Sequence, residues 1–198
     1  MCRSMAKAKP RDWRAARATG SPMCASSDRP IRLEAIPLAA LAELAEGRQP
    51  LGLGGVCEEG AWPPALVAQR ALRLLAEGGA ERWCLPYAML DARGVIVGGC
   101  GFKGEPCLGL VEIGYAVAPS RRGAGIATAA VGELLALALD GGARQVLAQI
   151  NPDNAPSSRL AARLGFTRGE VLVDDEGEPL AQWLWPGAID SVQDGGYP

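Results

Sequence analysis

The sequence has 198 residues, 48% hydrophobic and 21% charged, enough for one domain of roughly 150 residues with a single core. Residues 1–32 hold eight basic and two acidic residues, a net charge of +6, while the remainder carries −8. A domain that acidic lacks the basic surface that nucleic-acid binding requires. Because the chain contains no His, Ser-His-Asp hydrolysis and His-ligated zinc are excluded.

The cysteines and the hydropathy pattern indicate a reduced, cytoplasmic protein. The six Cys form no C-x-x-C pair, so they predict neither a metal site nor a disulfide framework. Cys84 and Cys100 lie in apolar stretches and are expected to be small core residues. The sequence has no run of about 18 apolar residues, so no membrane span is predicted. Its N-terminus also lacks the apolar region of a secretory signal.

The two ends of the chain differ from its middle. Residues 1–28 show no sustained periodicity and are rich in Arg, Ala and Ser, a composition shared by transit peptides and disordered tails. We expect a disordered basic tail there, and leave open whether translation starts at Met5 or Met23. The domain is expected over residues 29–186, followed by a flexible tail over 187–198.

In chain order, the pattern predicts alternating strands and helices. Strands are expected, from alternation and turn residues, at Pro30–Ile36, Trp83–Leu90, Val95–Phe102, Leu108–Val117, Arg144–Ile150, Phe166–Val173 and Leu180–Trp185. Helices are expected, from apolar spacing, at Pro37–Gly47, Ala65–Glu77, Gly123–Asp140 and Ala155–Leu164. A glycine-rich loop lies at Leu51–Gly60, and residues 91–94 form a turn. The order predicts an α/β fold with a mixed sheet.

The segment from Glu112 to Thr128 is the most informative. A strand ends, Pro119 breaks it, and a loop with two Arg and two Gly leads into a helix. Amide groups at a helix N-terminus lack partners and carry partial positive charge, so the pattern indicates an anion site, most simply for a phosphate. The alternative is an ordinary strand-helix turn with solvated arginines.

The residue spacing in this loop distinguishes between the phosphate-containing ligands that it could bind. A dinucleotide fold requires G-x-G-x-x-G/A, and here Thr128 occupies the last place. A P-loop requires Gly-Lys-Ser/Thr, and this loop has no Lys. The segment instead resembles the acetyl-CoA loop of the GNAT superfamily of N-acetyltransferases, Arg/Gln-x-x-Gly-x-Gly/Ala, with Arg122, Gly125 and Ala127 in its three places.

The resemblance extends over roughly residues 30–186. Upstream, Trp62-Pro63-Pro64, the run from Gly98 to Gly104 and Val111 to Tyr115 are similar to the branch of ribosomal-protein Nα-acetyltransferases (Rim-type). Downstream, the stretch from Asn154 to Phe166 resembles that branch's Asn-x-x-Ser helix ending in Leu-Gly-Phe.

The resemblance implies a mixed, mostly antiparallel sheet of about seven strands flanked by about four helices. A V-shaped gap between the fourth and fifth strands would hold the pantetheine arm of acetyl-CoA by sheet augmentation. Asn154 would contact that arm, or act simply as a helix N-cap. The residues implied to bind acetyl-CoA are Val117, Arg122, Gly123, Ala124, Gly125, Ile126, Ala127, Thr128 and Asn154.

Two residues are candidates for proton transfer. Glu112 is the one acid between Glu105 and the loop, and would take the proton of the acceptor amine. Its alternative roles are an exposed strand face or an ion pair with Arg121 or another Arg. Many relatives place Tyr, as acid for the leaving thiolate, where this chain has Ala161. The resemblance therefore suggests Ser157 as the donor, and a local backbone bond is its alternative.

Most remaining singled-out residues are expected to be structural. Tyr115 is expected to pack in the sheet, with a pocket-lining role left open, and Trp62 and Trp83 to be core residues rather than pocket residues. The two Trp of the last strand are expected to close the core, and residues 174–178 to form a charged hairpin turn.

The predicted function is transfer of an acetyl group from acetyl-CoA to a primary amine, directly in a ternary complex. The acceptor is a protein N-terminus or a small molecule such as an aminoglycoside or polyamine, and the sequence does not choose between them. The alternatives are an acyl-CoA-binding sensor and an interaction domain on the same fold. We expect no nucleic-acid or membrane partner, and a monomer or homodimer.

Overall fold

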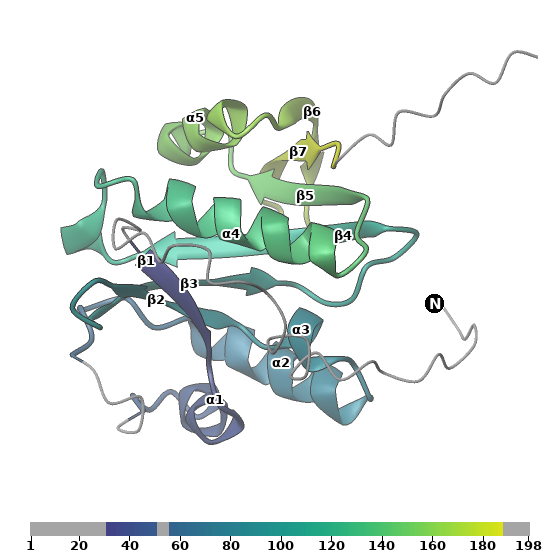
Figure 1. The fold of residues 1–198 in the computed structure, drawn as a ribbon. Helices are drawn as coiled ribbons and strands as arrows, with labels where there is room; N and C mark the ends of the chain where they lie inside the picture. The colour runs from purple at the N-terminus through teal and green to yellow at the C-terminus, as the bar shows by residue number, and fades with distance from the viewer. Residues whose placement is uncertain (1–30, 51–55, 188–198) are drawn as a thin grey trace, which may run out of the picture.

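The computed structural model describes residues 31–50 and 56–187, which form a seven-stranded sheet in the order β1-β2-β3-β4-β5-β7-β6 (Figure 1). The strands are β1 Ile31–Ala35, β2 Tyr87–Asp91, β3 Ile96–Phe102, β4 Leu110–Val117, β5 Gln145–Ile150, β6 Thr167–Val173 and β7 Pro179–Trp185. The helices are α1 Leu38–Ala45, α2 Ala65–Ala76, α3 Glu81–Cys84, α4 Ile126–Asp140 and α5 Ala155–Arg163, with a 3₁₀ turn at Pro119–Arg121. The predicted tails and part of the glycine-rich loop lie outside the described residues.

Alternation along the strands divides the apolar side chains between the two faces of the sheet. On β3, Val97 packs with the α4 side chains, whereas its neighbour Ile96 packs with those of α1 and α2. Successive strand residues point to opposite faces, so α4 covers one face and α1 with α2 the other, as Figure 1 shows. The predicted α/β architecture is confirmed.

The gap between the fourth and fifth strands is also confirmed. β4 and β5 are the parallel pair of the sheet, and their register runs from Leu110 opposite Gln145 to Ile113 opposite Ala148. β4 continues to Val117, where it still pairs with β3. Residues 114–117 of β4 therefore border the V-shaped gap that the family resemblance implied.

Gly98 allows β3 and β4 to approach closely beside this gap. A Cβ at position 98 would lie 2.5 Å from the Ala116 carbonyl oxygen and 2.9 Å from the Met89 sulfur. No side chain fits between those atoms, so the position accommodates glycine alone.

Two element predictions were wrong. Trp83 and Cys84 form the end of the short helix α3, because Pro86 separates them from β2, so the structure has a fifth helix where a strand was expected. Helix α4 begins at Ile126 rather than at Gly123, because Gly123 and Gly125 have φ of +79° and +76°. Left-handed residues do not continue an α-helix, so the glycines belong to the loop.

The expected structural residues are confirmed in their roles. Cys84 and Cys100 are buried, and the Trp83 ring packs edge-on against Phe102 with ring centres 4.8 Å apart. On β7, Trp183 is buried in the core that α4 covers. The hairpin turn at 174–178 forms as predicted, with the Asp174 carboxylate accepting two backbone N–H groups. None of the helices in the described part of the chain has the length and apolarity needed to cross a bilayer.

Candidate active site

The loop before α4 presents backbone amides that have no partner in the helix. Gly125 precedes the first turn, and Ala129 is the first residue whose N–H donates back to it. The amides of Ile126, Ala127 and Thr128 are therefore not used by the helix, since the first turn of any α-helix leaves its N–H groups unpaired. No side chain caps them, and the first turn carries no acidic residue. This end of α4 is suited to an anion.

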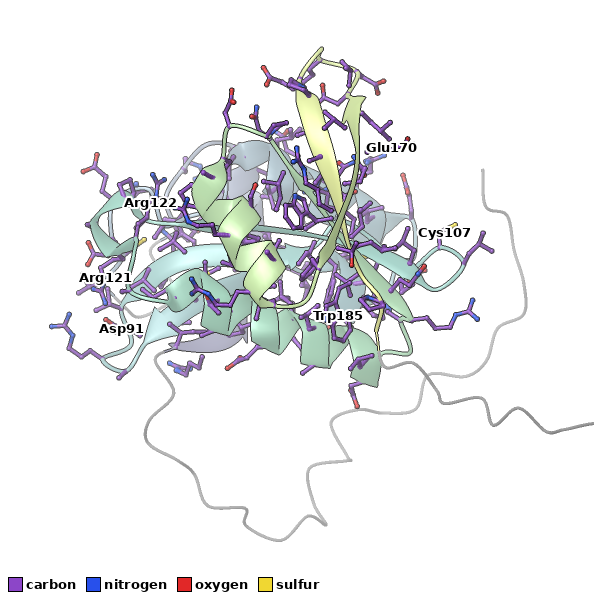
Figure 2. The ribbon with its side chains drawn as sticks, turned by 90° about the horizontal axis from the view of Figure 1, so that it is seen from above. Asp91, Cys107, Arg121, Arg122, Glu170 and Trp185 are labelled. Carbon is purple, nitrogen blue, oxygen red and sulfur yellow. The ribbon has the colours of Figure 1, made fainter. Side chains whose placement is uncertain are left out.

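Arg121 is a structural residue, so the alternative interpretation with solvated arginines does not hold for it. Its guanidinium donates to the Glu58 carboxylate at 3.0 Å and to the Asp91 carboxylate at 2.7 Å. Asp91 is 8% exposed and also accepts the backbone N–H groups of Arg93 and Val95. Burial acts to raise the pKa of the Asp91 carboxyl, but these hydrogen bonds and the Arg121 charge outweigh burial and hold the pKa below its ordinary value. Figure 2 shows Asp91 and Arg121 beside Arg122 at one end of the sheet.

Arg122 is exposed and lies against the end of β4. Its Nε donates to the Val117 carbonyl oxygen at 3.2 Å. The guanidinium is therefore held between the strand end and the loop, next to the amides at the start of α4.

The Val117 backbone faces the gap rather than β3. Val117 lies opposite Gly98, and the neighbouring Ala118 N–H donates to Val97 O across that pair. In an antiparallel ladder this pattern marks a non-hydrogen-bonded pair, whose own N–H and C=O groups point away from each other. Val117 therefore presents its N–H and C=O toward the side on which β5 has diverged.

Asn154 caps helix α5, as its alternative interpretation predicted. Its Oδ1 accepts the Ser157 N–H at 3.2 Å. Capping uses the amide oxygen, so the side-chain NH₂ of this exposed residue remains able to donate to a ligand.

Tyr115 brings a buried hydroxyl next to Ser157. The hydroxyl oxygen is buried and makes no hydrogen bond of ordinary geometry in the described structure. Burial raises the pKa of Tyr115, and the nearby Ser157 side chain acts in the opposite direction. Ser157 lies on α5 and Tyr115 on β4, and their side chains are near enough to interact. Ala161 of α5 is buried and offers no hydroxyl.

Glu112 forms an ion pair, but with Lys103 rather than with an arginine. The Lys103 ammonium contacts Glu112 Oε1, and the two residues are also joined by a backbone hydrogen bond at 2.8 Å. Both side chains are partly buried at the ends of β3 and β4. In the described part of the chain, Glu112 Oε2 has no hydrogen-bond donor and stays available to accept a proton.

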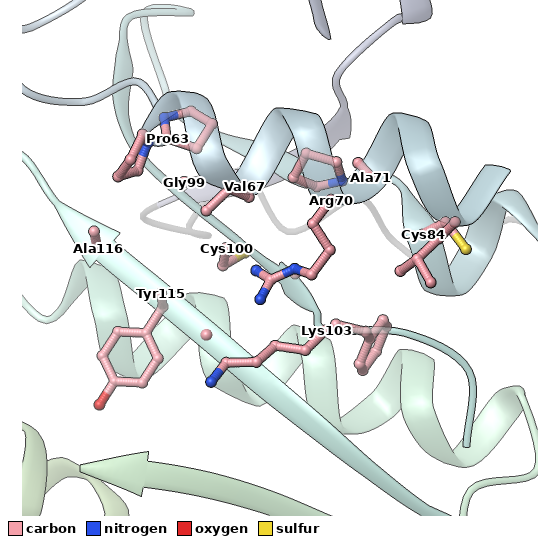
Figure 3. A pocket seen from close by; sticks show the side chains of 16 residues that line it. Pro63, Val67, Arg70, Ala71, Cys84, Gly99, Cys100, Lys103, Tyr115 and Ala116 are labelled. Carbon is pink, nitrogen blue, oxygen red and sulfur yellow. The ribbon is translucent and has the colours of Figure 1, made fainter. Parts of the chain in front are cut away.

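A cavity of about 270 Å³ lies between α2 and the β3-β4 ladder. Its walls are mainly apolar, with Val67 and Leu74 on α2 and Phe102 on β3. Gly101 and Gly114 are directly paired on its floor, where Gly101 lets β3 lie close to Pro86 and Gly114 leaves room beside the Lys103 side chain. Figure 3 shows Arg70 and Lys103 as the long cationic side chains of this cavity. Neither Trp62 nor Trp83 lines it.

The Acetyltransferase (GNAT) domain model matches residues 40–167, well over half of the chain. The chain belongs to the GNAT acetyltransferase family. The domain is accordingly an acetyl-CoA-dependent N-acyltransferase, which transfers an acetyl group to amines. The match spans the loop before α4 and both strands of the gap.

Solved acetyltransferases share the fold. A phosphinothricin acetyltransferase from Sinorhizobium meliloti, solved with acetyl-CoA, is 24% identical with a TM-score of 0.57, covering 85% of this chain and 96% of its own. A putative acetyltransferase from Salmonella typhimurium with acetyl-CoA is 17% identical, with a TM-score of 0.57 and coverages of 84% and 99%. The ribosomal-protein-S5-alanine acetyltransferase from Vibrio fischeri is 14% identical, with a TM-score of 0.58 and coverages of 81% and 94%. No curated protein matches the chain in sequence.

Sequence reasoning missed two features of this GNAT domain's cavity. Arg70 was not singled out, although it lies three residues after Val67 and four before Leu74, on the apolar stripe of its helix. A charge at such a position was the available signal. The Gly101–Gly114 pair had no signal, because strand register decides which glycines face each other.

Proposed function

We propose that this GNAT domain acetylates a primary amine by direct transfer from acetyl-CoA in a ternary complex. The observation that carries the proposal is that two openings meet on one segment of β4. Residues 114–117 border the gap beside β5, and Gly114, Tyr115 and Ala116 also line the cavity under α2. Donor and acceptor can therefore occupy opposite sides of the same strand at the same time, so no covalent enzyme intermediate is required.

The donor side of the proposal uses the loop and the strand end. The amides of Ile126, Ala127 and Thr128 would bind the diphosphate, with Gly123, Ala124 and Gly125 allowing its close approach and Arg122 adding charge. The Val117 backbone would pair with the pantetheine amides, and the Asn154 NH₂ would donate to the same arm. Acetyl-CoA supplies the activated thioester. The Arg122 bond to Val117 O holds the guanidinium beside this site.

Glu112 is the proposed base. In the reaction the amine nitrogen bonds to the acetyl carbon, the carbon–sulfur bond breaks, the amine loses a proton and the sulfur gains one. An alkylammonium has a pKa near ~10 and an α-ammonium near ~8, so a group must collect the proton. Glu112 is paired with Lys103, which lines the cavity, and its Oε2 would accept the proton directly or through water.

Ser157, with Tyr115, is the proposed donor to the sulfur. Their side chains lie near each other, and burial raises the pKa of Tyr115, which favours the protonated hydroxyl that a donor needs. A buried hydroxyl without a hydrogen-bond partner costs stability unless a ligand satisfies it. That cost supports a role for Tyr115 beside the bound thioester.

Two measurements test the proposed function. A rise in melting temperature with acetyl-CoA separates a donor-binding protein from an interaction domain. Release of free thiol with a panel of amines then separates an enzyme from a sensor. Binding of acetyl-CoA with no thiol release for any amine would refute the proposal. Membership of the Rim-type branch would be supported by acetylation of a peptide N-terminus.

A further inference from the structure

The cavity side of α2 contains one charge in an otherwise apolar stripe. Val67, Arg70, Ala71 and Leu74 follow the spacing i, i+3, i+4, i+7 and all line the cavity. This spacing places them on one face of the helix. A side chain on that face would ordinarily be apolar, so a guanidinium at this position indicates a polar or charged binding partner.

That guanidinium has no partner among the residues that the structure describes. Among residues 31–50 and 56–187, no carboxylate or carbonyl oxygen forms an ion pair or hydrogen bond with Arg70. The other partly buried arginines of the same part of the chain do have partners: Arg121 pairs with Asp91, and Arg82 with Asp140. Arg70 is only partly exposed, and Figure 3 shows its guanidinium between α2 and β4, toward Lys103.

We propose that the acceptor amine also carries a carboxylate, and that Arg70 binds this carboxylate. A guanidinium holds a carboxylate through two parallel hydrogen bonds, and apolar walls strengthen the attraction by keeping water away. The amine end would lie at Glu112 and β4, and the apolar body against Val67 and Leu74. The inference rests on the proposed function and names the substrate class of the same site.

The charges around the cavity disfavour the polycationic acceptors that the sequence left open. Among the described residues, Arg70 and Lys103 line the cavity and no acidic residue does. The nearby carboxylates are already engaged, since Glu112 pairs with Lys103 and Glu105 accepts the Ala80 N–H. A polyamine or aminoglycoside would bring several ammonium groups to a region of net positive charge. An amino acid brings one ammonium, opposite in charge to Glu112, and one carboxylate, opposite in charge to Arg70.

The test compares acids with their matched amides. Thiol release is measured with leucine, γ-aminobutyrate and ε-aminocaproate, which place the carboxylate at increasing distance from the amine, and with the amide of each. The panel also contains spermidine and a peptide with an N-terminal leucine and an amidated C-terminus. We expect at least one acid to have a kcat/KM about tenfold or more above its amide, the range of a charged hydrogen bond, and spermidine to be among the weakest acceptors.

Substitutions assign the preference to Arg70. Arg70→Met should raise KM for the preferred acid about tenfold while kcat and the values for its amide change little. Arg70→Lys should restore part of the preference, because it keeps the charge and loses the paired geometry. Arg73→Ala is the matched control, since Arg73 is an exposed arginine of the same helix that does not line the cavity. Melting temperatures check that each variant is folded.

A second readout does not depend on turnover. The carboxylic acid that corresponds to the preferred acceptor without its amine should inhibit the wild-type enzyme competitively, and Arg70→Met should lose this inhibition. Acids and amides acetylated equally, or a preference unchanged in Arg70→Met, would overturn the carboxylate assignment and leave the proposed function standing. No thiol release with any amine, despite acetyl-CoA binding, would overturn both.

Discussion

Gly125→Asp should weaken acetyl-CoA binding about 30-fold relative to Gly125→Asn, if the diphosphate binds at the start of α4. Gly125 has φ of +76°, and a Cβ there would meet no atom within 4 Å. Asp and Asn are the residues other than glycine that visit the left-handed region routinely, and both are good helix N-caps. The two variants therefore share the same backbone cost and should have similar melting temperatures. They differ in charge.

The magnitude follows from Coulomb's law. Position 125 is exposed, so the dielectric constant is close to that of water, and two unit charges ~4 Å apart then interact by about 1 kcal/mol. A diphosphate with about two negative charges gives about 2 kcal/mol, which is roughly 30-fold in Kd. Arg122→Ala should cost less, because it removes one exposed cation and leaves the helix amides in place.

Isothermal titration calorimetry with acetyl-CoA measures the difference. Raising the salt concentration should reduce it, since exposed charges are screened. S-acetylpantetheine, which lacks the diphosphate, is the control ligand and should bind both variants equally. Equal acetyl-CoA affinities for Gly125→Asp and Gly125→Asn would refute a diphosphate site at this helix end.

Three further predictions concern protons. Glu112→Gln should retain acetyl-CoA affinity and lower kcat in a thiol-release assay by roughly 10²-fold or more, with partial recovery at higher pH because more acceptor is already neutral; normal turnover at neutral pH would remove Glu112 from the mechanism. Ser157→Ala and Tyr115→Phe should each lower kcat about tenfold, since water substitutes in part. If the two hydroxyls serve one step, the losses of kcat should not multiply in the double variant, whereas full multiplication would show that they act separately. The lowered pKa of Asp91 means that its contribution to stability is present above its ordinary pKa of 3.8 and is lost as pH falls through the folded-state value. Urea unfolding should therefore show a decline in the free energy of unfolding below about pH 4 that Asp91→Asn removes, and an unchanged decline in that variant would assign it to other groups.

Local chemistry allowed most elements to be predicted from the sequence. Alternation located β3 and β4, and the glycines at 141 and 142 ended α4. The family resemblance came from three short motifs in order, with the loop at Arg122, Gly125 and Ala127 among them, and such motifs consist of residues that are neighbours in the sequence. The errors were also local: Pro86 separates α3 from β2, and the left-handed Gly125 delays the start of α4.

The sequence by itself determined the fold class, and it indicated a loop suited to an anion and Glu112 and Ser157 as candidates for proton transfer. Tertiary structure decided what each side chain meets. Lys103 pairs with Glu112 because antiparallel β3 and β4 bring them together, and Arg121 is taken by Glu58 and Asp91. Arg70 lines the cavity because the tertiary structure places α2 beside the ladder of β3 and β4. Such contacts join residues distant in the chain, and they depend on strand register and helix packing, which no short sequence pattern specifies.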